Sequence, residues 1–104
     1  MKMIRAIIRP EQEAAVKEAL EKAGQVALTK IHVFGRGKQV VQLGPLVYDE
    51  FPKVLLMAVV EDDKVAELNR AITEAARTGH VGDGKIFVSP VDEVYTIRTG
   101  ERGL

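Results

Sequence analysis

Residues 54–90 read VLLMAVVEDDKVAELNRAITEAARTGHVGDGKIFVSP and contain two predicted strands, a helix and a loop. The apolar run at 54–60 predicts a strand that requires cover on both faces. Apolar residues then recur at helical spacing through 62–77, which predicts an amphipathic helix. A glycine-rich loop follows at 78–84, and the β-branched and aromatic residues at 85–89 predict a further strand.

The helix at 62–77 has both a start signal and a buried stripe. Asp62 or Asp63 can cap its N-terminus, because a short carboxylate can accept from the first free N–H groups of a helix. The residues expected on its buried side are Val65, Leu68, Ile72 and Ala75 or Ala76.

The N-terminal half predicts a similar order of elements. Residues 1–9 alternate as a strand does, and 11–23 have helical spacing with Gly24 as the stop signal. Residues 25–34 predict a second strand, whereas 35–52 contain glycines and prolines without a sustained period and predict a long loop. In the first strand, one face is expected to carry Ile4, Ala6 and Ile8.

The predicted order is β-α-β-β-α-β, which is the ferredoxin-like α+β fold. In this fold two helices cover one face of a four-stranded antiparallel sheet. With 104 residues, the chain is expected to form one domain over 1–104. Because 54–60 is apolar throughout, the second face of the sheet also needs cover. Either another subunit or the C-terminal segment could supply it.

The composition excludes several classes of partner and site. Lys plus Arg and Asp plus Glu are both 15, so no overall charge favours nucleic acid or anionic lipid. The chain has no cysteine, which removes disulfides and thiolate chemistry and is typical of a reducing compartment. The longest apolar run is too short for membrane insertion, and the N-terminus does not resemble a signal peptide. We therefore expect a cytoplasmic protein.

The glycine-rich loop allows two interpretations. Gly79, Gly84 and Lys85 match a P-loop until its last position, where Ile86 replaces the magnesium-binding Ser or Thr. The context is also reversed, since a P-loop follows a strand and begins a helix, so we reject that motif. The backbone at Gly82 and Gly84, with Lys85 beside it, could still hold an anion. Alternatively, Gly79 ends the helix and an Asp-Gly turn follows.

Further cations occur where the fold could bring them near this loop. They are Arg36 and Lys38 at the start of the long loop, Lys53 at its end, and Arg98 near the C-terminus. Each alone fits a solvated surface charge. Together, in a chain without net charge, they fit a local triphosphate site.

Four segments resemble the PII signal-transduction family: MKMIRAIIRP at 1–10, GRGKQ at 35–39, YDEFPKVLL at 48–56 and TGHVGDGKIFVSPVDEVYTIRTGE at 78–101. The resemblance covers essentially the whole chain. Within the family, the chain is most similar to the subgroup that regulates nitrogenase in archaea and some anaerobic bacteria.

The resemblance implies a homotrimer, or a trimer with a homologous subunit, that binds ATP or ADP between neighbouring protomers. It implies sensing of 2-oxoglutarate together with Mg²⁺ and ATP. Residues 36–52 would form the flexible partner-binding T-loop, 78–85 the nucleotide-phosphate B-loop, and 96–104 the C-terminal loop.

The resemblance also assigns roles to single residues. Gln39 would bind Mg²⁺ and 2-oxoglutarate, and Lys53 would pair with the distal carboxylate of 2-oxoglutarate. The nucleotide-binding residues would be Ile7, Thr29, Gly35, Gly37, Lys38, Val59, Gly82, Asp83, Gly84, Lys85 and Arg98.

Some positions depart from the common family pattern. Lys38 stands where most members have arginine, which keeps the charge without the planar fork. Thr96 replaces a second usual arginine, which puts one phosphate contact in doubt. His80 replaces a usual lysine, and Tyr48 does not align with the tyrosine that some members have uridylylated, so no nucleotidylation is expected.

A sensor that is not an enzyme is the expected function, with nitrogenase as the expected target and an ammonium transporter as the alternative. No nucleophile-and-base pair is evident, and His32 and His80 lack a nearby acid. The rival from another class is a small ferredoxin-like phosphohydrolase that uses Asp83 as its base.

Overall fold

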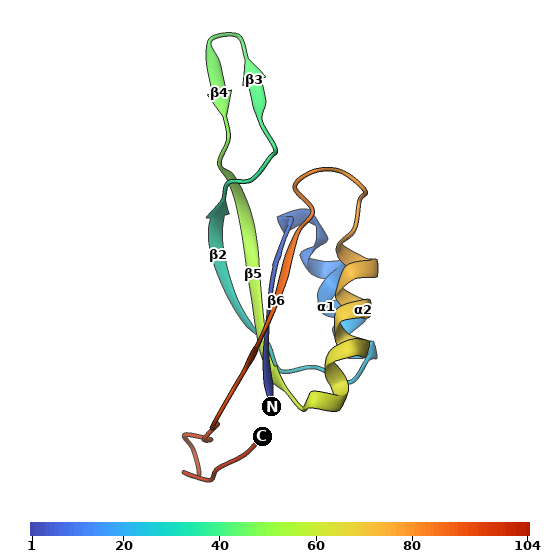
Figure 1. Cartoon of the computed structure of the whole chain (residues 1–104), viewed down its shortest axis with the longest axis vertical. Helices are drawn as coiled ribbons and strands as arrows, with labels where there is room; N and C mark the ends of the chain where they lie inside the picture. The colour runs from blue at the N-terminus through green and yellow to red at the C-terminus, as the bar shows by residue number, and fades with distance from the viewer.

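The computed structural model describes residues 1–104 and shows the ferredoxin-like fold (Figure 1). The four strands of the main sheet lie in the order β2-β5-β1-β6, and every neighbouring pair is antiparallel. The expected α+β architecture is confirmed. The elements in chain order are β1 (Lys2–Ile8), the 3-10 turn η1 (Pro10–Gln12), α1 (Glu13–Lys22), β2 (Thr29–Gly35), β3 (Val41–Leu43), β4 (Leu46–Tyr48), β5 (Phe51–Val60), the 3-10 turn η2 (Asp62–Lys64), α2 (Val65–Ala76) and β6 (Gly84–Pro90).

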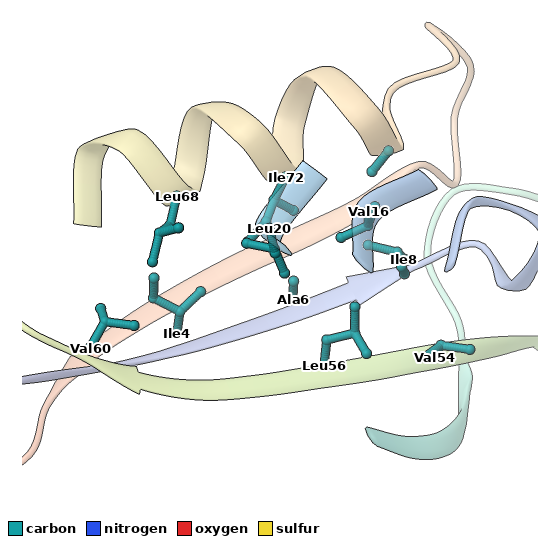
Figure 2. Packing of buried hydrophobic residues seen from close by; sticks show 11 residues of the cluster. Ile4, Ala6, Ile8, Val16, Leu20, Val54, Leu56, Val60, Leu68 and Ile72 are labelled. Atoms are coloured by element: carbon teal, nitrogen blue, oxygen red, sulfur yellow. The ribbon is translucent and has the colours of Figure 1, made fainter. Parts of the chain in front are cut away.

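The hydrophobic core lies between the sheet and the two helices (Figure 2). Ile4, Ala6 and Ile8 share one face of β1 as expected, and alternation along the strand directs all three toward the helices, where they are buried. Both helices contribute side chains at helical spacing to the same core: Val16 and Leu20 from α1, and Leu68, Ile72 and Ala76 from α2. Antiparallel pairing places Ile8 at the end of β1 opposite Gly84 at the start of β6.

The second strand begins later than the sequence predicts. Gly24, with a φ of 91°, follows α1, and the N–H of Gln25 returns to the carbonyl of Leu20 at 2.8 Å. This C-terminal turn uses the residues immediately after the helix, so β2 starts at Thr29 rather than at residue 25.

The start of α2 also differs from the prediction. Neither Asp62 nor Asp63 caps the helix, because both lie in the 3-10 turn η2. The residues at the N-cap positions of η2 and α2 make no capping hydrogen bond with their side chains. The Asp62 carboxylate instead lies 2.8 Å from the N-terminal amine of Met1, which lowers the pKa of Asp62.

The expected long loop contains a hairpin. Strands β3 and β4 pair with each other, and Gly44, with a φ of 60°, and Pro45 form the turn between them. The strand β5 already begins at Phe51. The hairpin projects beyond the main sheet (Figure 1) and its side chains are exposed.

The sheet face opposite the helices is apolar and uncovered. Leu55, Met57 and Val59 on β5 lie on this face, which we call the open face, together with Ile31 on β2 and Phe87 on β6. Ile31 is 43% exposed and Phe87 50% exposed. The tail beyond β6 leads away from the sheet (Figure 1), so the alternative that the C-terminal segment covers this face is wrong. No helix has the length and hydrophobicity to span a membrane.

Candidate functional site: a nucleotide and effector cleft

The loop between α2 and β6, residues 78–83, is held together by the carboxylate of Asp83. Asp83 Oδ2 accepts hydrogen bonds from the backbone N–H groups of Thr78 and Gly79, both at 2.9 Å. Asp83 Oδ1 accepts from the Thr78 hydroxyl and from Arg9 Nε, the latter at 3.0 Å. Asp83 therefore connects the beginning of the loop to its end.

This environment determines what Asp83 can do chemically. The hydrogen bond from the Thr78 hydroxyl, the backbone donors and Arg9 lower the pKa of Asp83 far below its ordinary value. A carboxylate so stabilised is a weak proton acceptor, and both its oxygens already have donors. Asp83 thus fits a structural role in the loop and does not suit the base of a phosphohydrolase.

Two glycines, Gly82 in the loop and Gly84 at the start of β6, are required by their surroundings. Gly82 has a φ of 103° and Gly84 a φ of 114°, which favour a residue without a side chain. A Cβ on Gly84 would overlap with the backbone carbonyl of Ile7. Gly79 also has a positive φ, but it does not end the helix, because α2 ends at Ala76 and Arg77 is already extended.

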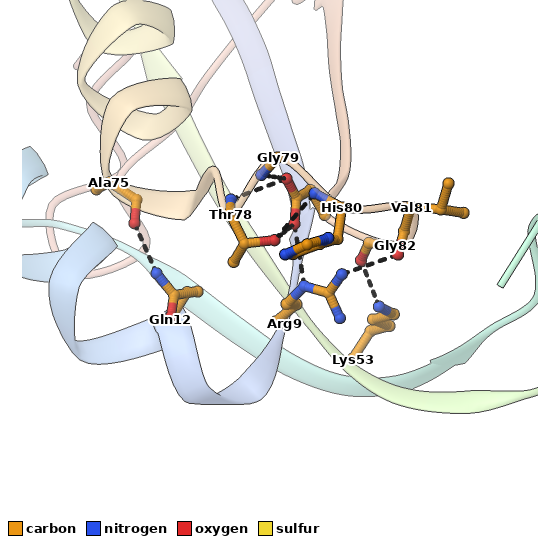
Figure 3. Close-up of polar contacts among 10 residues, drawn as sticks. Arg9, Gln12, Lys53, Ala75, Thr78, Gly79, His80, Val81 and Gly82 are labelled. Atoms are coloured by element: carbon orange, nitrogen blue, oxygen red, sulfur yellow. Dashed lines mark hydrogen bonds and ion pairs between the residues drawn. The ribbon is translucent and has the colours of Figure 1, made fainter. Parts of the chain in front are cut away.

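Gln39 and Lys53 converge on Gly82 from the base of the hairpin. Lys53 Nζ donates to the carbonyl oxygen of Gly82 at 2.6 Å, as Figure 3 shows. The position that a Cβ of Gly82 would occupy is already filled by the side-chain oxygen of Gln39. The structure therefore brings both residues expected at the effector site against the loop expected to hold phosphates.

Both side chains are in conditions that suit binding. Lys53 is only 8% exposed, and burial, followed by the charge of Arg9, lowers its pKa. Gln39 Oε1 is buried and has no hydrogen-bond partner, although buried polar atoms usually have one. A neutral amide oxygen is a ligand that Mg²⁺ accepts, so Gln39 fits the expected metal position.

Arg9 is the residue of this site that sequence reasoning missed. It follows β1, and its guanidinium donates both to Asp83 and, from Nη2 at 2.9 Å, to the carbonyl of Val81 (Figure 3). Only its position directly before Pro10 distinguished it in the sequence from other charged residues at strand ends.

A cleft of about 310 Å³ lies beside this network. Its wall includes four of the expected nucleotide-binding residues, which are Ile7, Asp83, Gly84 and Lys85. The register explains why they meet, since Ile7 pairs with Lys85 across β1 and β6. The other lining residues are Ile72, Thr73 and Ala76 of α2, Arg77 directly after that helix, and Ile8 and Ile86.

Three further candidate residues lie around the base of the hairpin. Gly35 ends β2, and a Cβ there would lie 3.3 Å from the Lys53 side chain. Gly37 and Lys38 follow in the bend before β3. Arg36, another candidate cation, instead pairs with Asp49 across the base of the hairpin at 3.4 Å.

The remaining candidates do not meet the loop within one chain. Thr29 pairs with Met57, and Val59 lies two residues further along β5, so both are on the open face away from Gly82. Arg98 lies in the tail after β6, at the opposite end of that strand from Lys85 (Figure 1).

The comparison with known proteins covers the whole chain. The family model described as nitrogen regulatory protein P-II matches residues 1–101. The nitrogen fixation nifHD region glnB-like protein 1 of Methanococcus maripaludis is 55% identical over 105 residues, with 100% of both chains covered. The nifHD1 region GlnB-like protein 1 of Methanosarcina barkeri is also 55% identical over 105 residues, with the same coverage.

A relative that is named differently gives the same result. The nitrogen regulatory protein P-II of Azospirillum brasilense is 47% identical over 108 residues, which cover 99% of this chain and 96% of that protein. The chain therefore belongs to the nitrogen regulatory protein P-II family, whose members are signal transducers.

Proposed function

We propose that this protein is a nitrogen sensor that binds ATP or ADP and, with Mg²⁺ and ATP, 2-oxoglutarate. It controls a target protein through the T-loop at 36–52. The observation that carries the proposal is the convergence of Gln39 and Lys53 on Gly82. There the unpaired side-chain oxygen of Gln39 and the buried ammonium group of Lys53 both lie against the glycine-rich loop. A dianionic effector and a metal ion would satisfy both groups at once.

The nucleotide phosphates lie against the B-loop at 78–85 in this proposal. Its glycines allow backbone N–H groups to approach an anion, and Lys85 adds a charge beside the cleft. Gly35, Gly37 and Lys38 complete the site at the base of the T-loop.

The complete site requires a trimer. The open face of the sheet is apolar and exposed, which favours association with other copies of the chain or with a homologous subunit. Arg98, Thr29 and Val59 lie far from the B-loop of their own chain, so a neighbouring protomer supplies them to the nucleotide. The C-terminal loop at 96–104 then crosses the boundary between protomers.

Ligand binding controls the T-loop through its base. Gln39 precedes the hairpin and Lys53 follows it, so a ligand that reorganises both changes the direction in which the hairpin projects. The coupling is reciprocal, because ATP must tighten 2-oxoglutarate binding by the same factor as 2-oxoglutarate tightens ATP binding.

Nitrogenase is the proposed target. The support is that the relatives from Methanococcus maripaludis and Methanosarcina barkeri are named for the nitrogen fixation nifHD regions. An interaction with nitrogenase places the protein in the cytoplasm.

Isothermal titration calorimetry tests ligand binding. Wild-type protein is titrated with ATP, with ADP, and with 2-oxoglutarate in the presence and absence of MgATP. Lys85→Ala should weaken the binding of both ATP and ADP, and 2-oxoglutarate should bind only in the presence of MgATP. Unchanged ATP affinity in this variant would move the phosphate site elsewhere, and turnover of ATP well above about 1 per second would favour an enzyme.

Affinity capture from nitrogen-fixing cells tests the target. We expect immobilised protein to retain nitrogenase and to release it on addition of MgATP with 2-oxoglutarate. Retention of an ammonium transporter instead would identify the alternative target.

A further inference from the structure

We propose that Arg9 is a positioning residue, which holds the 78–83 loop in the shape that accepts nucleotide and presents Gly82 to Gln39 and Lys53. This inference rests on the proposed function, because it concerns how the same site is organised. Arg9 would act through the loop rather than by touching the ligand.

The contacts of Arg9 fix both halves of the loop. Nε donates to Asp83 at 3.0 Å, and Asp83 in turn accepts from the backbone of Thr78 and Gly79 at the start of the loop. Nη2 donates to the carbonyl of Val81 at 2.9 Å. The side chain of Arg9 is only 13% exposed, and its bond to Asp83 is partly shielded from water, whereas its bond to the Val81 carbonyl is exposed.

A third relationship connects Arg9 to the effector side chains. The position of a Cβ on Gly82 lies 3.2 Å from Arg9 Nη2 and overlaps with the Gln39 amide. Lys53 binds the carbonyl of the same glycine. Arg9 and the two effector side chains therefore all lie around Gly82, so a change in the loop at this residue affects the surroundings of all three.

The geometry requires an arginine and not only a positive charge. Two nitrogens of one planar group donate to two acceptors, Asp83 and Val81, that belong to different parts of the loop. A lysine would retain the charge, but its single nitrogen cannot reproduce this pair of bonds in fixed directions. This difference separates a positioning role from a direct electrostatic one.

The test compares Arg9→Lys and Arg9→Gln with wild type and with Arg70→Gln, a control on the exposed surface of α2. Calorimetry measures the ATP affinity and the coupling factor, which is the factor by which MgATP increases the affinity for 2-oxoglutarate. Both Arg9 variants should lose about tenfold in ATP affinity and most of the coupling factor, because hydrogen bonds to charged groups are lost in each. Wild-type behaviour of Arg9→Lys would overturn the inference in favour of a charge effect.

Thr78→Val gives an independent arm if the Arg9 variants fold poorly. It removes a donor to Asp83 at the other end of the loop and leaves the charge of Arg9 in place. We expect the same loss of coupling, with faster amide hydrogen exchange at 78–84 and unchanged exchange in β1. A Thr78→Val variant with wild-type coupling and wild-type amide hydrogen exchange in the loop would contradict positioning through Asp83.

The controls separate this inference from the proposed function. Failure of the wild-type protein to bind ATP would overturn the proposed function and this inference with it. Normal binding by wild type together with unchanged binding by both Arg9 variants would overturn the inference alone.

Discussion

The side-chain oxygen of Gln39 lies buried against the α-carbon of Gly82, where any larger residue would collide with it. Gln39 stands at the base of the hairpin and Gly82 in the loop before β6, so two segments distant in sequence meet at one carbon atom. Because Gln39 Oε1 has no hydrogen-bond partner there, packing and not a hydrogen bond holds this oxygen in place. A ligand that offers its oxygen a partner can therefore displace it readily.

Gly82→Ala should abolish 2-oxoglutarate binding while the protein remains folded. The added methyl group displaces the Gln39 amide, which is the movable end of a flexible side chain. The positive φ should cost roughly 1–2 kcal/mol of unfolding free energy. Gly24→Ala is the control, because it has a similar φ of 91° and no atom near its Cβ position. Denaturant unfolding and calorimetry of both variants test this, and intact effector binding in Gly82→Ala would contradict it.

Gln39→Ala should leave ADP binding nearly intact and abolish 2-oxoglutarate binding. In the proposed function only the effector complex needs a metal ion held by the amide oxygen, so calorimetry should separate the two ligands. Gln42→Ala serves as the matched control, since its side chain bonds only the carbonyl of Gly44 at the hairpin turn. Equal losses of ADP and 2-oxoglutarate in Gln39→Ala would show that the residue supports the whole cleft instead.

The parts of the fold that follow a local period could be predicted from sequence. On the first strand the buried residues are every second one, Ile4, Ala6 and Ile8. On the second helix Leu68 and Ile72 are four residues apart, so in both elements the spacing of apolar residues in the sequence indicates which face is buried. The hairpin was missed because its strands Val41–Leu43 and Leu46–Tyr48 are too short to show a period.

The site was predictable only where a motif or a resemblance marked it. The glycines at 82 and 84 indicate a backbone conformation that other residues rarely adopt, and both have a positive φ in the structure. Arg9 could not be found in this way, because its partner Asp83 is 74 positions away and no local pattern connects them. The same holds for Lys53 and Gly82, whose contact depends on the antiparallel arrangement of the whole sheet.

Asp83 should make stability depend on acid. Its folded pKa is depressed, so its contribution is fully present above the unfolded pKa of about 3.9 and is lost as the pH falls from there toward the folded value. The difference in melting temperature between wild type and Asp83→Asn should therefore be largest near neutral pH and shrink below about pH 4. Glu13 and Asp62 also have lowered pKa values, but both proteins contain them and they cancel in the difference. A difference that stays constant with pH would contradict this role.

Phe87→Glu should convert the proposed trimer into single chains that remain folded. Phe87 lies on the open face and is 50% exposed, so a charge there costs little in the isolated chain but is buried on association. Val26→Glu is the control, as Val26 is 72% exposed and lies in the connection between α1 and β2. Sedimentation velocity distinguishes the states. A trimeric Phe87→Glu protein, or a monomeric wild type, would show that the open face is not the interface.

The hairpin should recognise its target with one face. Val41, Leu43, Leu46 and Tyr48 share one side of the β3–β4 pair, and Val47 stands on the other side opposite Gln42. The double variant Leu43→Ser, Leu46→Ser should change unfolding free energy by less than about 0.5 kcal/mol, since both side chains are more than half exposed. ATP binding should be unchanged, while nitrogenase capture from cell extract should fail. Val47→Ser, which removes a 60% exposed apolar residue from the opposite side, should still capture nitrogenase. Equal loss in both variants would mean that the target encloses the hairpin rather than packing on a single side.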